Sequence, residues 1–297
     1  MGAARDAAPE TTIVSVGDRE ADIYDLFLAQ RPAGVELLVR AQHDRWVRVA
    51  TDEQRHIHAL RATLAAAPVA GERTVAVPRR PGHPARVATL AVRFQQVTLT
   101  PPPVSGRRPL PPVPLWAIRA TEEDPPTDVE PLDWLLLPTV PVTSCEDAQE
   151  RIDWYVCRWT IEVWHKVVTS GCAMERRQRA SAENPQRGLA LYSVVAWRVL
   201  YATLLARAVP AVPCTVLHEA TEWQALDWAI HQTPTPPAQP PSLGVAVQWV
   251  AHLGGYMGRR RDGPPGPIVL WRGLQRLVDL TIMYQVFAPP PGRRKCG

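Results

Sequence analysis

One short segment of the sequence concentrates side chains that could act on a phosphate ester. Four of them follow one another at intervals of three or four residues: Tyr155, Arg158, Glu162 and Lys166. On an α-helix, residues with this spacing fall within roughly 80° of one another around the axis. Cationic side chains bind phosphate, and carboxylates bind divalent metal ions. The pattern therefore fits two interpretations: a site that handles metal and phosphate, or a solvated helix surface with internal ion pairs.

Asp18 is a second candidate, because it directly follows a short β-branched segment, residues 12–16. Open α/β sheets bind their ligands at the carboxyl ends of their strands. Aspartate is also a common turn residue, so its position alone leaves a purely structural role open. The apolar residues between positions 21 and 27 predict a helix that runs back across the sheet.

The elements that would position these residues can be predicted from local patterns. Thr143 and Glu146 have the spacing of a helix capping box, and Gly171 is a typical helix stop. Apolar residues between them, such as Ile152 and Val163, form a stripe beside the polar face. The sequence thus predicts one helix that is buried on one side and presents the four polar residues on the next.

The two blocks together resemble a known family. Residues 18–22 read D-R-E-A-D, and the block from Tyr155 reads Y-x-x-R-x-x-x-E. Both resemble the catalytic motifs of bacterial DDE transposases of the insertion-sequence four group. Residues 133–137 resemble the strand that carries this family's base-flipping tryptophan, here Trp134. Residues 253–256 and 270–273 resemble its C-terminal dimerisation region.

The resemblance implies a fold, a reaction and a set of roles. The fold would be α/β: a partial ribonuclease-H-like core with a β-strand insertion, followed by a helical C-terminal dimerisation region. The reaction would be metal-dependent DNA cleavage and strand transfer, with two Mg²⁺ or Mn²⁺ ions in the intact family site and Asp18 and Glu162 as catalytic metal ligands. The residues implied to contact DNA are Trp134, Tyr155, Arg158, Lys166, Arg176 and Arg177. The partners would be DNA and a second transposase chain, identical or full-length.

Two departures from the family pattern bear on activity. The family's first catalytic acid lies on the opening strand of the sheet, whereas Asp6, upstream of Asp18, has no strand pattern around it. We therefore expect an N-terminally truncated member that is inactive alone, with an open edge on the strand at residues 12–16. The family's motif lysine falls on Thr169 here, and Lys166, one turn earlier on the same face, is the candidate replacement.

The remaining sequence divides into three predicted regions. Residues 1–30 and 141–209 would form the core, residues 31–140 a β-rich insertion, and residues 210–297 the helical C-terminal region. Strands are predicted at 35–41, 46–49, 73–77, 86–100, 115–120 and 134–137. Helices are predicted after residue 185 and near 222–230, 242–253 and 270–287.

The amino-acid composition is compatible with a nucleic-acid-binding protein but is not specific to one. The net charge is +4, a modest excess that suits phosphate binding and also occurs in many other proteins. The five cysteines lack metal-binding spacing, which favours reduced thiols and a cytoplasmic, nucleoid-associated bacterial protein. Residues 189–209 are apolar but interrupted by Arg198 and Arg207, which favours a buried helix over a membrane span.

Three functions remain open from the sequence. The first is a transposase remnant or one half of a split transposase. The second is a regulator that dimerises with full-length transposase and inhibits it. The third is an independent metal-dependent nuclease.

Overall fold

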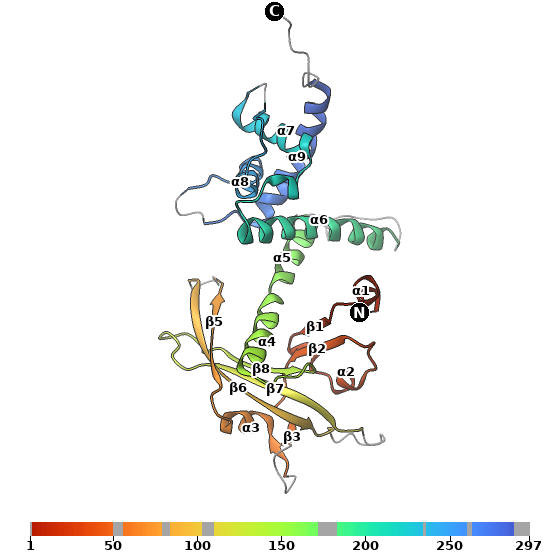
Figure 1. Cartoon of the computed structure of the whole chain (residues 1–297), viewed down its shortest axis with the longest axis vertical. Helices are drawn as coiled ribbons and strands as arrows, with labels where there is room; N and C mark the ends of the chain where they lie inside the picture. The colour runs from red at the N-terminus through yellow and green to blue at the C-terminus, as the bar shows by residue number, and fades with distance from the viewer. Residues whose placement is uncertain are drawn as a thin grey trace, which may run out of the picture. The chain divides into compact units, whose positions relative to one another are not determined.

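The chain forms two compact units, which are described separately: a first unit, Met1–Trp159, and a second unit, Thr160–Gly297. The computed structural model (Figure 1) describes residues 2–49, 56–78, 84–102, 110–171, 183–233, 236–259 and 263–287. The first unit is a mixed α/β structure, and the described part of the second is helical.

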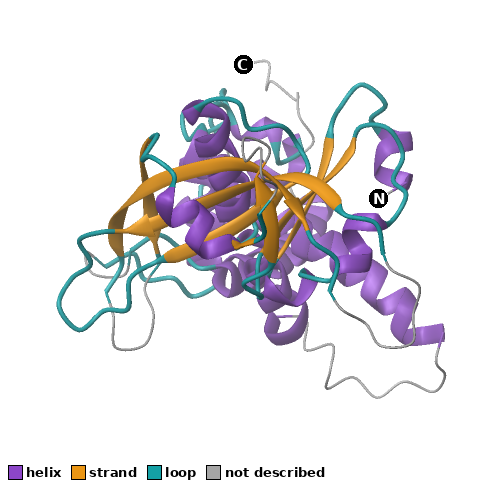
Figure 2. Ribbon diagram, turned by 90° about the horizontal axis from the view of Figure 1, so that it is seen from below, coloured by secondary structure: helices purple, strands orange, loops and turns teal. Residues whose placement is uncertain are grey.

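One eight-stranded sheet organises the described part of the first unit. Its strands are β1 (Ile13–Gly17), β2 (Val35–Arg40), β3 (Trp46–Val49), β4 (His58–Ala59), β5 (Gly71–Val77), β6 (Arg86–Leu99), β7 (Val113–Glu122) and β8 (Asp133–Pro138). The order is β1-β2-β8-β7-β6-β3-β4, and β5 pairs with β6 outside this path. Only the β1–β2 pair is parallel among these strands. Figure 2 shows the twist of the sheet. All six strands predicted between residues 35 and 137 are present, which confirms this part of the prediction.

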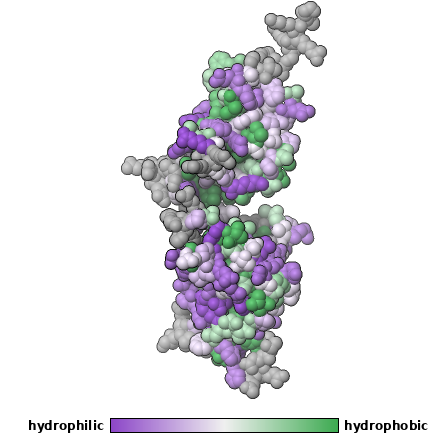
Figure 3. Space-filling model, turned by 90° about the vertical axis from the view of Figure 1, so that its left-hand side faces the viewer, coloured by the Kyte–Doolittle hydropathy of each residue, from purple (hydrophilic) through white to green (hydrophobic). Residues whose placement is uncertain are grey.

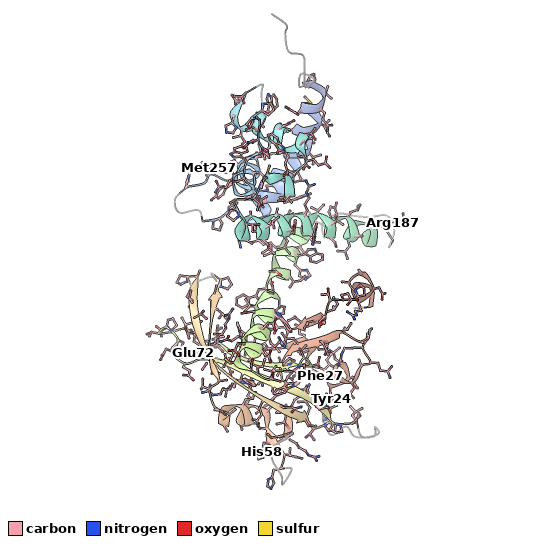
Figure 4. All side chains as sticks on the ribbon, viewed as in Figure 1. Tyr24, Phe27, His58, Glu72, Arg187 and Met257 are labelled. Carbon is pink, nitrogen blue, oxygen red and sulfur yellow. The ribbon has the colours of Figure 1, made fainter. Side chains whose placement is uncertain are left out.

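Helices cover both faces of the sheet because buried side chains alternate along its strands. Leu37 and Leu135 point to one face, which packs against α2 (Tyr24–Leu28) and α3 (Leu60–Ala66). Their neighbours Leu38 and Leu136 point to the other face, which packs against α4 (Cys145–Cys157). Figure 1 shows α4 on one side of the sheet and α3 on the other, and Figure 4 labels Tyr24 and Phe27 of α2. The helix predicted after Asp18 is short: a 3₁₀ turn, η1 (Arg19–Ala21), precedes the five residues of α2.

Strand β1 lies at the edge of the sheet, as predicted. Within the described residues it pairs with β2 alone, from Ile13 opposite Val35 to Gly17 opposite Val39. An unpaired strand edge presents backbone N–H and C=O groups that can pair with another strand.

Helix α4 begins one residue later than the sequence predicts. Its N-cap is Ser144, whose side chain accepts a hydrogen bond from the Asp147 amide, while the Asp147 carboxylate accepts one from the Ser144 amide. The predicted Thr143–Glu146 capping box is therefore wrong, although Thr143 also donates to Asp147. A capping box of this kind satisfies amide groups that the first helical turn leaves unpaired.

The second unit packs its helices around one apolar core. Its elements are α5 (Thr160–Lys166), η2 (Val167–Gly171), α6 (Glu183–Ala208), η4 (Cys214–Val216), α7 (Ala220–His231), α8 (Leu243–Leu253) and α9 (Pro267–Phe287). The predicted C-terminal helices are all present, and the helix predicted to begin at residue 242 begins at Leu243. Among the described residues one segment, Arg187–Ala208 of α6, is long and apolar enough to cross a membrane. Ala196 and Val199 of this helix are buried in the protein core, whereas other apolar side chains such as Leu191 and Val194 are exposed, so packing within the chain accounts for only part of its apolar character.

Two glycines let α8 and α9 approach each other closely. A Cβ atom on Gly254, which follows α8, would lie 1.9 Å from the carbonyl oxygen of Val269. A Cβ atom on Gly273, inside α9, would lie 1.8 Å from the carbonyl oxygen of Val250. Both distances are far below van der Waals contact, so this packing requires glycine at both positions. The two glycines belong to the two C-terminal motifs singled out in the sequence.

The predicted three-part division of the chain stays a prediction, since the division into compact units does not define domains. The sheet joins β1 to the strands between residues 31 and 140.

Figure 3 shows that hydrophilic and hydrophobic residues are mixed over the surface on the face drawn there.

Candidate functional site

Asp18 lies at the carboxyl end of β1, as the sequence predicts. It is the N-cap of η1, and its carboxylate accepts a hydrogen bond of 2.9 Å from the Arg19 amide. Small neighbours make this turn possible: a Cβ atom on Gly17 would lie 2.5 Å from the Cβ of Ala21. The close approach of these two residues explains why a glycine precedes Asp18 and an alanine follows three positions later.

The neighbouring strand places Arg40 beside Asp18. Because β1 and β2 are parallel and Gly17 is opposite Val39, the carboxyl ends of both strands lie side by side. Arg40 ends β2, and its Nη1 atom lies 3.8 Å from the Asp18 carboxylate. The same Nη1 donates a hydrogen bond of 3.3 Å to the Tyr155 hydroxyl.

The end of α4 completes this cluster. The Tyr155 hydroxyl donates a hydrogen bond of 3.2 Å to Asp18, and Nη2 of Arg158 lies 3.0 Å from the second carboxylate oxygen. Tyr155 is 1% exposed, which fixes the position of its hydroxyl. The Nε atom of Arg158 is buried and has no hydrogen-bond partner among the described residues. We refer to Asp18, Arg40, Tyr155 and Arg158 as the Asp18 cluster.

These contacts set the charges within the Asp18 cluster. Burial acts to raise the pKa of the Asp18 carboxyl group, but the Arg19 amide, Arg158, Tyr155 and Arg40 together lower the pKa below its ordinary value. Burial raises the pKa of the Tyr155 hydroxyl. At neutral pH the cluster therefore contains an ionised carboxylate, a protonated phenol and two guanidinium groups.

A polar pocket of about 800 Å³ surrounds the Asp18 cluster in the first unit. Its lining includes Arg61 and Asp133, which form an ion pair at 2.8 Å, and Arg19 and Arg86. The pocket is also lined by acidic residues, namely Asp18, Asp128, Glu130 and Asp133, and Arg86 is paired with Glu122. Guanidinium groups suit an anion such as a phosphate, which would here compete with the carboxylates that already pair with them.

Trp134 is one of the residues that line this pocket, and it is 2% exposed. Its ring contacts those of Tyr155 and Trp159 edge to face, with centroid distances of 5.2 and 6.1 Å. A base could stack on this indole only after Trp134 had left its present packing.

The predicted continuous helix through Tyr155 and Lys166 is wrong. Helix α4 ends at Cys157 and α5 begins at Thr160. Between them the amides of Arg158 and Trp159 bond to carbonyl groups three residues earlier, at 3.1 Å each. Such bonds make a tighter turn than an α-helix. The regular α-helical spacing that would place Tyr155, Arg158, Glu162 and Lys166 on one face therefore does not continue through residues 158 and 159.

The break also separates the predicted site residues between the two units. Glu162 and Lys166 lie on α5 of the second unit, where both are exposed. Thr169, at the position of the motif lysine, donates a hydrogen bond of 2.8 Å to the carbonyl oxygen of His165. The predicted DNA contacts Arg176 and Arg177 lie outside the described residues.

The described residues do not fit a two-metal centre by themselves. They contain no group of three or more His, Cys, Asp or Glu side chains placed to hold a metal ion. Asp18 is the carboxylate of its cluster, and both of its oxygens face guanidinium groups. A divalent ion at Asp18 would need further carboxylates and a displacement of Arg40 or Arg158.

Sequence reasoning missed Arg40 and the Arg61–Asp133 pair. Arg40 could have been found, because it lies at the end of the apolar strand that follows the Asp18 strand in the sequence. Arg61 offers no such signal, since it joins the pocket through a long-range ion pair.

Comparison with known families finds a match within the second unit. Residues 194–285 match the family model of the transposase Tn5 dimerisation domain. The matched segment runs from within α6 almost to the end of α9. The protein is therefore related to Tn5-type transposases, and the match supports formation of an oligomer.

Proposed function

We propose that this transposase-related protein is a DDE transposase polypeptide of the insertion-sequence four group, which takes part in cut-and-paste DNA transposition. The observation that supports the proposal is the Asp18 cluster, in which an aspartate at the end of a strand lies next to two guanidinium groups and a phenol. The dimerisation-domain match elsewhere in the same chain supports it.

The roles of the residues follow from their chemistry. Arg40 and Arg158 would bind the DNA backbone, and the unsatisfied Nε of Arg158 offers a further donor for a phosphate oxygen. Asp18 would serve as a metal ligand together with Glu162 once the site is complete. Trp134 would stack on a flipped base after leaving its packing, a contact worth about 1–3 kcal/mol.

The site is incomplete without a further acid. Two-metal phosphoryl transfer uses divalent ions about 3.5–4 Å apart, held by several carboxylates. A ribonuclease-H-like core would place one of these carboxylates on a strand next to β1. The open edge of β1 supports this arrangement, because it leaves room for such a strand. We propose that a segment not contained in residues 1–297 supplies it, in a bacterial, nucleoid-associated assembly.

The first prediction concerns catalysis. Because the described residues lack a full set of metal ligands, the purified chain with Mg²⁺ or Mn²⁺ is expected neither to nick nor to join plasmid DNA. Gel assays at increasing protein concentration check this. Cleavage that is lost in both Asp18→Ala and Glu162→Gln would contradict the prediction and establish an independent nuclease.

The second prediction concerns DNA affinity. Binding is expected to be independent of sequence, with log K falling linearly against log salt as counterions are released. Arg158→Ala should reduce the magnitude of this slope by about 1, the change expected for the loss of one phosphate contact. Exposed Arg48, far along the sheet on β3, provides the matched control, whose replacement by alanine should leave the slope nearly unchanged. Fluorescence anisotropy over a salt series measures both, and a salt-insensitive affinity for one sequence would refute the prediction.

A dimerising inhibitor of a full-length transposase is the second candidate function. The observation that favours it is a dimerisation-domain match in a chain whose described residues lack a complete metal site. Adding this chain to an active transposase of the same family should then reduce transposition in proportion to mixed-dimer formation. Unchanged transposition despite mixed dimers would reject inhibition.

A further inference from the structure

Both oxygens of the Asp18 carboxylate are occupied by neighbouring groups. Oδ1 accepts hydrogen bonds from the Arg19 amide at 2.9 Å and from the Tyr155 hydroxyl at 3.2 Å. Arg40 lies 3.8 Å from the same oxygen, and Arg158 lies 3.0 Å from Oδ2. A divalent ion bound here would lie close to two guanidinium charges, which repel it. In this arrangement Asp18 is therefore closed to a metal ion.

Arg158 pairs with Asp18 through only one of the two nitrogen atoms on an edge of its guanidinium group. Nε and Nη2 form this edge, and together they can donate to one carboxylate or phosphate. Arg73 uses both atoms in this way on Asp153, at 2.9 and 2.6 Å. Arg158 has Nη2 beside Asp18, whereas its Nε is buried and lacks a hydrogen-bond partner among the described residues. Because a buried N–H without an acceptor is costly, an acceptor at this edge would be favoured.

Arg40 is held in the Asp18 cluster by long contacts. Its Nη1 lies 3.3 Å from the Tyr155 hydroxyl, and its Nη2 lies 3.4 Å from the carbonyl oxygen of Asp133. Ordinary N–H···O hydrogen bonds measure about 2.7–3.2 Å, so these contacts are weak. By contrast, both Nη atoms of Arg86, another arginine of the pocket, donate to Glu122. Arg40 therefore loses less hydrogen bonding than Arg86 when it takes a new partner.

An anion at these two arginines would change the charge that an approaching cation meets. One carboxylate and two guanidinium groups give the Asp18 cluster a net charge of +1. A phosphodiester carries one negative charge, so its binding would bring the net charge to about zero. It would also compete with Asp18 for Arg158, and its charge would repel the carboxylate. Asp18 would then be released from its guanidinium partners.

We infer that Arg40 and Arg158 form an anion-operated lock on Asp18, which keeps this carboxylate closed to divalent ions until a tetrahedral anion takes over the two guanidinium groups. The inference rests on the proposed function for the source of the anion, a phosphodiester of bound DNA. By thermodynamic linkage, the anion and the divalent ion then raise each other's affinity by the same factor.

The first experiment removes the lock and measures Mn²⁺ binding to the full chain by electron paramagnetic resonance. Without any added anion, Arg158→Gln should lower the Mn²⁺ dissociation constant at least about fivefold, because it removes a positive charge next to Asp18. Adding Asp18→Asn to this variant should abolish the gain, which would assign the ion to Asp18. Equal Mn²⁺ binding by the unchanged chain and by Arg158→Gln would overturn the inference.

Arg93 provides the matched control for this substitution. Its side chain is 19% exposed, against 18% for Arg158, and it also pairs with a carboxylate, that of Glu123 at 3.2 Å. It is not among the residues that line the pocket. Arg93→Gln should leave the Mn²⁺ dissociation constant within about twofold of the unchanged chain. A gain as large as that of Arg158→Gln would show a general charge effect and refute the lock.

The second experiment opens the lock in the unchanged chain with a small anion. Dimethyl phosphate, a phosphodiester without bases or sugar, should lower the Mn²⁺ dissociation constant at least about fivefold. In Arg158→Lys the same anion should change the constant less than about twofold, because lysine keeps the charge but lacks the planar edge. Sulfate serves as a free dianion for comparison. No effect of dimethyl phosphate, or an effect of sulfate alone, would overturn a lock that a phosphodiester opens.

These measurements use no DNA, so they separate the lock from the proposed function. Coupling between dimethyl phosphate and Mn²⁺ in a chain that does not bind DNA would support the lock and count against a transposase. DNA binding without any such coupling would leave the proposed function in place and refute the lock.

Discussion

Replacing Asp22 by alanine is expected to destabilise the first unit by about 3–5 kcal/mol, because it leaves a buried guanidinium without its partner. Asp22 is 5% exposed, and its carboxylate receives two hydrogen bonds from Arg45, at 2.6 and 2.9 Å. The amides of Gln42 and His43 donate to the other carboxylate oxygen, at 2.8 and 3.0 Å. One side chain thus holds the turn that connects β2 to β3. Hydrogen exchange of β2 and β8 amides measures the effect in this unit alone.

Asp25 supplies the matched control, since it is the same residue type three positions later and is exposed. Asp25→Ala should cost less than about 1 kcal/mol. The double variant Asp22→Ala with Arg45→Ala should be less destabilised than the sum of its single variants, because no unpaired charge remains. Equal effects of Asp22→Ala and Asp25→Ala would show that the buried ion pair is not a main contribution to stability.

The second large effect is expected for Gly273→Ala in the second unit. An added Cβ would lie 1.8 Å from the Val250 carbonyl oxygen, so α8 and α9 would have to separate. Loss of packing along both helices should reduce the free energy of unfolding by about 3 kcal/mol or more. Urea denaturation, followed by hydrogen exchange of α8 amides, measures the change.

Gly266 provides the control for this substitution, because a Cβ there would meet nothing within 4 Å. Gly266→Ala should change stability by less than about 1 kcal/mol, with a small gain from a less flexible unfolded chain. If Gly273→Ala is equally well tolerated, the close backbone approach of α8 and α9 is wrong.

Much of the first unit was predictable because its strands carry strong local patterns. Each predicted strand between residues 35 and 137 combines apolar alternation with flanking turn residues, and each is present in the sheet. The position of Asp18 was predictable for the same reason, because the local pattern predicts a strand that ends just before this residue.

The site itself depends on contacts between residues far apart in sequence, which local patterns do not encode. Trp159 packs edge to face against Trp134, and at this point the chain tightens into a turn that divides the predicted helix. Arg40 joins the Asp18 cluster only through the parallel register of β1 and β2. The two aspartates of D-R-E-A-D look alike in sequence, yet Asp18 lines the pocket whereas Asp22 is buried in a structural ion pair.

The position of β2 in the sheet also determines the order in which the first unit can fold. On one side β2 pairs with β1, which precedes it closely in sequence, but on the other Leu38 pairs with Pro138, far along the chain. Pairing over such a separation is slow, because a long loop must close before any contact forms. During synthesis on the ribosome, the apolar β2 must therefore wait with one edge unpaired until β8 has emerged. The first unit therefore passes through a stage of synthesis in which an unpaired apolar strand edge is open to pairing with other chains.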